Sequence, residues 1–384
     1  MKTSRIISAG LAMFAMLFGA GNVVYPLALG RDIGHQVWFG LLGFVLTAVL
    51  IPLIGLVSTM LAEGNYKIFL GSLGRIPGNL IIIFCMALLG PFGFASRCIT
   101  LSHAALKPYA PGMSLMIFSM ITAVIIFACT IRRNSVIDLM GKYLGPLKLT
   151  LLFAIIVFGL LNPVPFVQVG LSASQAFSMG LESGFGTGDL LATIFFSGLI
   201  LGGLRFGMDK DEQLSPRDLA KIGLKAGLIG GSLLGIVYAG FCVVAAYWGS
   251  QLVGVADADV FSVLARMILG EAGGLLANVT IALSCLTTTI ALSVVFASYL
   301  HKELFREKTS YCNVLLLAVG LTTIMSNLGF AGIMKILLPI LGVIYPALVV
   351  LAIMHMVYKL GGVKIIKVPV TLTFIFTLIL KYVI

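Results

Sequence analysis

Long apolar stretches follow one another along almost the whole chain, and short polar segments separate them. About 20 apolar residues are enough to cross a bilayer as a helix. Eleven stretches approach or exceed this length, at residues 6–30, 36–61, 77–106, 113–131, 143–162, 187–208, 222–248, 272–300, 311–328, 331–357 and 366–383. The pattern predicts an all-α polytopic membrane protein with about 11 transmembrane helices.

Composition excludes a soluble protein and sets the expected orientation. Hydrophobic residues make up 60% of the 384 residues and charged residues only 10%, against about 25% charged in soluble domains. The net charge of +11 does not indicate a nucleic-acid partner, because the basic residues form no single patch. Eighteen of the 25 lysines and arginines fall at alternate junctions, and only four at the opposite ones. This asymmetry predicts a cytoplasmic N-terminus.

Two apolar stretches contain helix-breaking residues at corresponding places. Phe18-Gly19-Ala20-Gly21-Asn22 interrupts the first stretch, with Pro26 close behind. The sixth stretch carries Ser197-Gly198 and then Gly202-Gly203. The second break lies five spans after the first. Because this number is odd, the two interrupted helices run in opposite directions. Such a pair indicates the binding site of a secondary transporter built from inverted repeats; the alternative is that these glycines only allow close helix packing.

The eighth stretch carries a polar segment, Ser284 to Thr289, which includes three consecutive threonines. Hydroxyls in an apolar helix often bond back to their own backbone, but three neighbouring threonines cannot share one face. Together with carbonyls of a broken helix they would form an all-oxygen site, which suits a hard monovalent cation such as sodium.

Ionisable residues inside membrane spans are functional candidates by default. Arg97 lies deep in the third span, where it either pairs with Asp189 or binds backbone carbonyls and holds a kink near Pro91. Lys148 lies about six residues into the fifth span. It either snorkels to the cytoplasm or reaches the level of the cation site. The four histidines lie at span ends, so the sequence offers no catalytic constellation and predicts no enzyme.

Six segments share the pattern of one known family: Phe14–Gly30, Leu42–Ala48, Gly90–Arg97, Val136–Lys142, Gly180–Ala192 and Cys285–Thr288. Together they resemble the bacterial branched-chain amino acid:cation symporters (the LIVCS family, BrnQ type). The chain departs from the family pattern at Ser96 and Gly188, where a Pro and a Met are usual.

The resemblance implies the LeuT-like fold of the amino acid–polyamine–organocation superfamily, a 5+5 inverted repeat with broken helices 1 and 6. The first repeat would span 1–162, an extracytoplasmic loop 163–186, the inverted second repeat 187–358, and an additional helix 359–384. The implied activity is uptake of leucine, isoleucine, valine and other apolar amino acids across the bacterial cytoplasmic membrane by cation symport with alternating access, and sodium is the favoured cation. No cofactor and no obligate protein partner are expected.

The resemblance also implies a site. The substrate carboxylate and ammonium would meet the backbone around the two breaks, at Leu17, Gly19, Ala20, Gly21, Asn22, Phe196, Ser197 and Gly198. Sodium would bind carbonyls of Ala15, Phe18 and Ser284 and hydroxyls of Thr287 and Thr288. In the alternative, a proton-coupled permease of the same fold, the Lys148 ammonium takes the place of sodium. Arg97, Lys148 and Asp189 are the candidates for coupling or gating.

Overall fold

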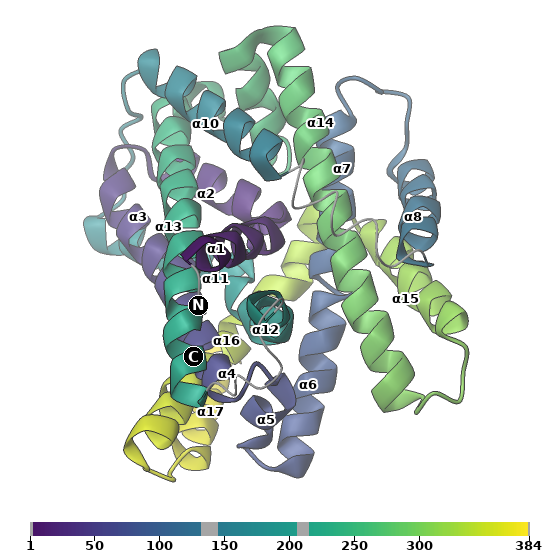
Figure 1. The fold of residues 1–384 in the computed structure, drawn as a ribbon. Coiled ribbons are helices and arrows are strands. Elements are labelled where there is room, and N and C mark those ends of the chain that lie inside the picture. Colours follow the sequence, from purple (N-terminus) through teal and green to yellow (C-terminus); the bar gives the residue numbers. More distant parts are fainter. Residues whose placement is uncertain (1–2, 132–144, 206–214, 383–384) are drawn as a thin grey trace.

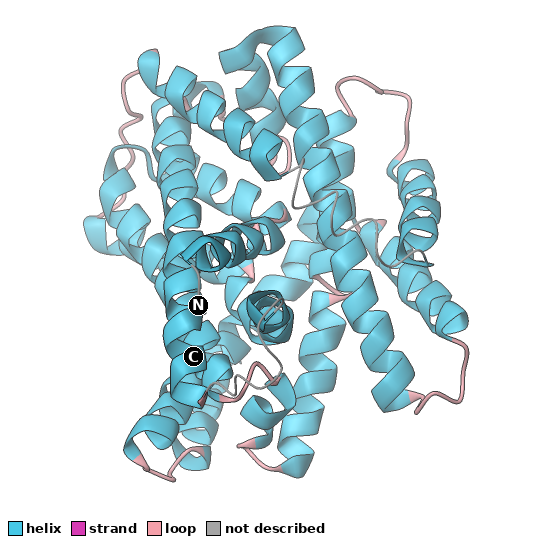
Figure 2. Cartoon of the chain, in the orientation of Figure 1, coloured by secondary structure: helices cyan, strands magenta, loops and turns pink. Residues whose placement is uncertain are grey.

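A computed structural model describes residues 3–131, 145–205 and 215–382. The Val136–Lys142 motif lies outside these ranges. All regular elements within them are helical (Figure 2). The α-helices, labelled in Figure 1, are α1 (Thr3–Leu17), α2 (Ala20–Ile33), α3 (Val37–Val45), α4 (Ile51–Leu61), α5 (Tyr66–Gly71), α6 (Arg75–Leu89), α7 (Phe94–Leu106), α8 (Leu115–Ile131), α10 (Gly145–Leu161), α11 (Ala173–Thr187), α12 (Asp189–Arg205), α13 (Pro216–Tyr247), α14 (Val260–Tyr299), α15 (Tyr311–Ser326), α16 (Gly329–Gly361) and α17 (Lys367–Tyr382). π-helical turns at Leu46–Leu50 and Leu300–Leu304 join α3 to α4 and extend α14.

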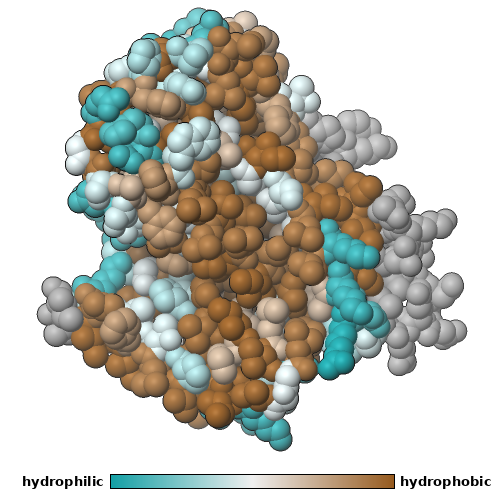
Figure 3. All heavy atoms as spheres, turned by 90° about the vertical axis from the view of Figure 1, so that its left-hand side faces the viewer, coloured by the Kyte–Doolittle hydropathy of each residue, from teal (hydrophilic) through white to brown (hydrophobic). Residues whose placement is uncertain are grey.

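The surface matches a protein that lies in a bilayer. Most of the face drawn in Figure 3 is hydrophobic. Large apolar side chains such as Trp38, Leu42 and Leu80 are more than 60% exposed, which water would disfavour but lipid accommodates. Six helical segments of the described chain are long and apolar enough to cross a membrane, and four shorter apolar helices accompany them. The exact number of spans stays a prediction.

The first break lies where the sequence predicts it. Helix α1 ends at Leu17 and α2 begins at Ala20. Gly19, between them, has extended backbone angles and donates its N–H to Asn22 Oδ1 at 2.9 Å. An Asn three residues ahead thus satisfies one backbone donor that the interrupted helix leaves free.

The second break lies at Gly188, and its prediction at Ser197-Gly198 and Gly202-Gly203 was wrong. Helix α12 runs through these glycines without interruption. Gly188 instead ends α11 with φ 91°, a left-handed conformation that favours glycine and closes helices. The predicted loop over 163–186 is corrected as well, because residues from Ala173 onward form α11, the first half of this broken helix.

A close approach of two helices fixes the position of α11. Gly180 of α11 lies against Gly40 of α3, and a Cβ on Gly180 would come within 2.0 Å of the Gly40 carbonyl oxygen. Any larger residue would push the two backbones apart. The α3–α11 contact therefore holds the end of α11, and with it the Gly188 break, at a defined place beside α2.

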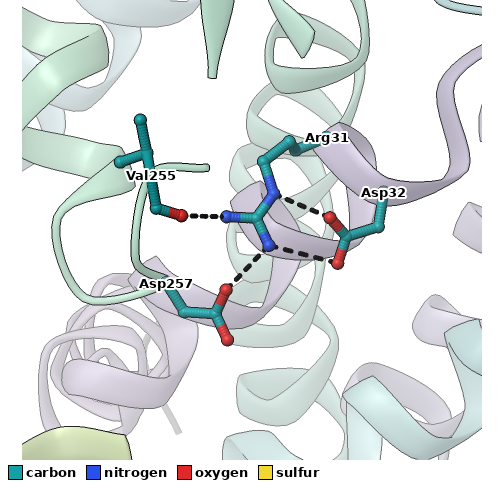
Figure 4. Close-up of polar contacts among 4 residues, drawn as sticks. All are labelled: Arg31, Asp32, Val255 and Asp257. Carbon is teal, nitrogen blue, oxygen red and sulfur yellow. Dashed lines mark hydrogen bonds and ion pairs between the residues drawn. The ribbon is translucent and has the colours of Figure 1, made fainter. Parts of the chain in front are cut away.

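One end of the molecule, called here the Arg31 end, is closed by an ionic cluster (Figure 4). Arg31 lies in the last turn of α2 and donates to the adjacent Asp32 carboxylate at 2.7 Å. It also donates to the Val255 carbonyl and to Asp257 Oδ1, both at 2.7 Å. Val255 and Asp257 belong to the segment between α13 and α14. The arginine thus ties the end of the first broken helix to a distant connection.

We expect Arg31→Ala to destabilise the protein by about 1–2 kcal/mol, since it removes charge-assisted hydrogen bonds between separate elements. Lys221→Ala is the control, because Lys221 pairs with Asp218 three residues away in α13 and this ion pair joins no separate elements. Thermal unfolding in detergent micelles checks both variants. An Arg31→Ala protein as stable as the unmodified one would show that the Arg31 cluster does not stabilise the fold.

Candidate functional site

Both helix breaks border one small cavity of about 30 Å³, called here the central cavity. Of the predicted substrate residues, Leu17, Gly19, Ala20, Asn22 and Phe196 line it. Arg97, Asp189 and Thr288 complete its polar wall. Ser197 instead donates to the Gly64 and Ile194 carbonyls within packed helices, and Gly198 lines a different cavity. The structure therefore assembles the first-helix part of the predicted site but replaces Ser197 and Gly198 by residues at Gly188.

A buried hydrogen-bond network connects the two breaks directly. Asn22 donates its Nδ2 to both carboxylate oxygens of Asp189, at 2.8 and 2.9 Å. Tyr238 of α13 donates its hydroxyl to Asp189 Oδ2 at 2.7 Å and contacts Asn22 Nδ2 as well. All three side chains are at most 1% exposed. Tyr238 was not predicted; a lone hydroxyl in an apolar stretch was its only signal in the sequence.

Arg97 binds backbone carbonyls, the second of the two predicted arrangements. Its Nη1 donates to the Gly186 carbonyl at 2.7 Å and its Nη2 to the Thr187 carbonyl. The side chain is 2% exposed, and its guanidinium lies 4.3 Å from the centre of the Phe94 ring. Arg97 therefore holds the last turn of α11 rather than forming an ion pair with Asp189.

Lys148 reaches the position predicted for sodium. Its ammonium donates to the Phe18 carbonyl at 3.2 Å and to Ser284 Oγ at 3.0 Å. It also lies 4.7 Å from the centre of the Phe18 ring, within cation–π range. Lys148 is 5% exposed, so it does not snorkel to the surface. A protein cation thus contacts two residues of the predicted sodium set.

The other predicted sodium ligands are only partly assembled. The Thr287 and Thr288 hydroxyls both donate to the Ser284 carbonyl, at 2.8 and 3.0 Å, which is the local bonding that isolated helical hydroxyls adopt. The Thr288 side chain lies against the first break, 3.3 Å from where a Cβ on Gly19 would stand. Ala15 lies in the last turn of α1, two residues before its end. The role of these residues as metal ligands stays a prediction.

Four helix ends meet at the two breaks, and protein charges compensate three of them. Helix C-termini carry partial negative charge and N-termini partial positive charge. Lys148 lies at the C-terminus of α1, Arg97 at that of α11, and Asp189 at the N-terminus of α12. No charged side chain of the described residues is hydrogen-bonded to the N-terminus of α2, where Ala20 and Gly21 begin the helix. The Ala20 backbone is hydrogen-bonded to the Cys98 side chain, and the positive end of the helix dipole favours an anion nearby.

A larger cavity of about 560 Å³ lies toward the other end of the molecule, called here the Lys67 end. Apolar residues of α12 and α14 form most of its wall, and Tyr66, Lys302 and Glu303 stand at its rim. Lys67 of α5 forms an ion pair with Glu303 beside it. Burial, and secondarily the Glu303 carboxylate, raises the pKa of Tyr66 to about 12, so its hydroxyl stays protonated at neutral pH.

About one helical turn separates the two cavities. On α6 the larger cavity is lined by Met86 and the central one by Leu89. On α12 the neighbouring residues Phe195 and Phe196 line the larger and the central cavity respectively. The two cavities are therefore adjacent, and side chains of α6 and α12 lie between them.

Comparison with known proteins decides what kind of protein carries this site. A family model described as "Branched-chain amino acid transport protein" matches residues 2–383. The chain belongs to this family. It is thus a multi-pass membrane transporter of the branched-chain amino acid class, not an enzyme.

Individual members of the family are similar over most of their length. The "Branched-chain amino acid transport system 3 carrier protein" of Pseudomonas aeruginosa is 30% identical over 360 residues, which cover 91% of this chain and 80% of the relative. The "Branched-chain amino acid permease BrnQ" of Bacillus subtilis is 28% identical over 371 residues, 93% of this chain and 83% of the relative.

Solved structures support the predicted LeuT-like fold. An inward-facing conformation of Mhp1 superposes with a TM-score of 0.68 at 15% identity, and covers 92% of this chain and 77% of that one. A closed conformation of Mhp1 with bromovinylhydantoin bound has a TM-score of 0.62 at 16% identity. At these identities the likeness concerns the fold of the transporter alone.

Proposed function

We propose that the transporter takes up leucine, isoleucine and valine by proton symport, with Lys148 as the coupling residue. The single observation that carries the choice of cation is the contact of the Lys148 ammonium with the Phe18 carbonyl and Ser284 Oγ. The lysine already contacts two residues of the predicted sodium site. Sodium binding there would be unfavourable, since two cations at one site repel each other.

The substrate would bind in the central cavity with its carboxylate at the N-terminus of α2. A helix N-terminus carries partial positive charge and favours an anion, and no charged side chain of the described residues is hydrogen-bonded to the backbone at this one. Phe196 and Leu292 give the cavity apolar walls that suit a branched aliphatic side chain. The cavity of the present state is too small for an amino acid, so binding requires the surrounding half-helices to move apart.

Coupling would follow from the charge on Lys148. A protonated amine makes a charge-assisted bond to the end of α1, whereas the neutral amine makes only a weaker one. Proton loss would loosen α1 from α10 and α14 and favour a different conformation. Substrate and proton that prefer the same conformation raise each other's affinity by reciprocal linkage.

Under this proposal the Lys67 end would face the cytoplasm, since the excess of basic residues at alternate junctions predicts the cytoplasmic side there. The larger cavity would then be the cytoplasmic vestibule, and the Arg31 cluster would close the outer side. The membrane would be the bacterial cytoplasmic membrane, as the relatives from Bacillus subtilis and Pseudomonas aeruginosa suggest.

Uptake of labelled leucine into proteoliposomes tests the proposal. One pH unit corresponds to about 1.4 kcal/mol, so an inward proton gradient of one unit should drive about tenfold accumulation for one proton per substrate. A sodium gradient at equal pH should drive none, and a protonophore should abolish the effect. Accumulation driven by sodium alone would contradict the assignment to Lys148 and restore sodium as the coupling ion.

A further inference from the structure

The two charged side chains that line the central cavity lack counter-ions in the described part of the chain. Arg97 and Asp189 are 2% and 1% exposed. Neither takes part in any of the ion pairs formed within residues 3–131, 145–205 and 215–382. A buried charge is stable only when an opposite charge or several hydrogen bonds accompany it. Both side chains meet the second condition through neutral groups, and neither forms an ion pair with a described residue beside the cavity.

Asp189 has only neutral donors around it. Asn22 gives its amide to both carboxylate oxygens, and Tyr238 gives its hydroxyl to one of them. Thr187 gives a further side-chain hydrogen bond, so neutral groups supply about all the hydrogen bonds that an ionised carboxylate accepts but no opposite charge. Asp189 also lines the central cavity, so a ligand there can supply the opposite charge.

Arg97 borders the place proposed for the substrate carboxylate. Its Nη2 lies 2.5 Å from where a Cβ on Gly21 would stand, so the guanidinium is adjacent to the first turn of α2. Its two terminal nitrogens bind the Gly186 and Thr187 carbonyls. Its Nε is buried with no hydrogen-bond partner among the described residues. The cavity thus has a positive and a negative side.

We propose that Asp189 binds the α-ammonium group of the transported amino acid while Arg97 flanks its α-carboxylate. The pair would recognise the substrate as a zwitterion, and the substrate would supply the counter-charge that each side chain lacks. This inference rests on the proposed function and adds the residues that distinguish an amino acid from other branched aliphatic compounds. It also replaces the predicted ammonium site at Ser197 and Gly198.

Two analogues of leucine test the inference on the unmodified protein. 2-Hydroxy-4-methylpentanoate lacks the ammonium group and 3-methylbutylamine lacks the carboxylate. A buried group left unpaired by an analogue penalises binding strongly, so we expect each analogue to compete with labelled leucine at least about 100-fold more weakly than leucine itself. An analogue that competes as well as leucine would overturn the corresponding half of the inference. This measurement requires no variant.

Variants separate recognition from structural support. Asp189→Asn keeps the shape of the side chain and removes its charge, so leucine affinity should fall by about tenfold or more while affinity for the hydroxy acid stays unchanged. Tyr238→Phe is the matched control, because it removes one neutral donor from the same carboxylate and should leave the ratio of the two affinities intact. Arg97→Gln should in the same way reduce the preference for leucine over the amine.

The outcomes are distinct. If Asp189→Asn weakens leucine and the hydroxy acid equally, Asp189 only positions the helix breaks and the inference is wrong. If the unmodified protein fails to bind leucine at all, the proposed function itself is wrong and the zwitterion site falls with it. Thermal unfolding of each variant shows whether a lost affinity reflects a lost fold.

Discussion

Lys148→Met should lose proton-driven accumulation of leucine completely while it still exchanges leucine across the membrane. Methionine keeps the length and the apolar stem of lysine but carries no proton, so the site loses its titratable cation. The contact between α14 and the end of α1 is preserved, because Ser284 Oγ also donates to the Phe18 carbonyl at 3.3 Å. Exchange of leucine requires only that the leucine-loaded transporter can change conformation. Net accumulation of leucine also requires that this conformational change is coupled to the proton gradient.

The measurement compares net uptake under an imposed pH gradient with counterflow at equal pH in proteoliposomes. Net accumulation should fall from about tenfold to none, with counterflow retained. Lys335→Met is the matched control, since Lys335 is an exposed lysine on α16 and its loss should change neither assay. A Lys148→Met protein that accumulates leucine like the unmodified one would exclude Lys148 as the coupling residue.

The same variant separates the two candidate cations. If removal of the lysine opens the oxygen ligands around Phe18 and Ser284, a sodium gradient should begin to drive uptake only in Lys148→Met. Such a gain would mean that lysine and sodium are alternative occupants of one position. No sodium response in either protein would mean that these oxygens serve the lysine alone.

The first break and the family could be predicted from sequence because their signals are local. Gly19, Gly21 and Asn22 follow one another, and a Pro comes soon after, so the backbone itself disfavours a continuous helix there. The apolar runs likewise carry their information in single segments. The order of the helices could therefore be predicted from the apolar runs and the first break, because each of these local patterns is consistent with the fold.

The second break could not be predicted in the same way because contacts between distant residues decide it. Ser197-Gly198 and Gly202-Gly203 carry more helix-breaking residues than Thr187-Gly188-Asp189, yet they stay helical. What stabilises the break at Gly188 is the bond of Asp189 to Asn22 and the bonds of Arg97 to two carbonyls. None of these contacts leaves a trace in residue spacing. Helix α11 differs, because a capping box of Ser172 and Gln175 marks its start in the sequence, and the assignment of this segment to a loop overlooked it.

Lys148 illustrates a third case, in which the sequence named the residue but not its role. Its depth in the fifth span was compatible with snorkelling and with a contact at the cation site. Only the approach of α10 to the end of α1 and to Ser284 distinguishes the two. Long flexible side chains are the hardest to assign from sequence, because several partners lie within their reach.

Gly21→Ala should reduce leucine binding by about tenfold or more and destabilise the protein by about 1–3 kcal/mol, the usual cost of overpacking. A Cβ at this position would stand 2.5 Å from Arg97 Nη2 and 2.8 Å from the Thr187 carbonyl oxygen. Arg97 cannot simply swing away, because its two terminal nitrogens hold the end of α11. The methyl group would therefore separate the two breaks.

Two further glycines give a graded series that attributes the effect to this contact. A Cβ on Gly19 would meet Thr288 Cγ2 at 3.3 Å, a tight contact that the neighbour can relieve, so Gly19→Ala should weaken leucine binding less. Gly202 has nothing within 4 Å of its Cβ position and lies within α12. Gly202→Ala should leave binding unchanged and stabilise the helix by up to about 1 kcal/mol. Isothermal titration of leucine binding, with thermal unfolding in parallel, checks this order of the three variants. Equal affinities for all three would refute the claim that close contact of the two breaks forms the binding site.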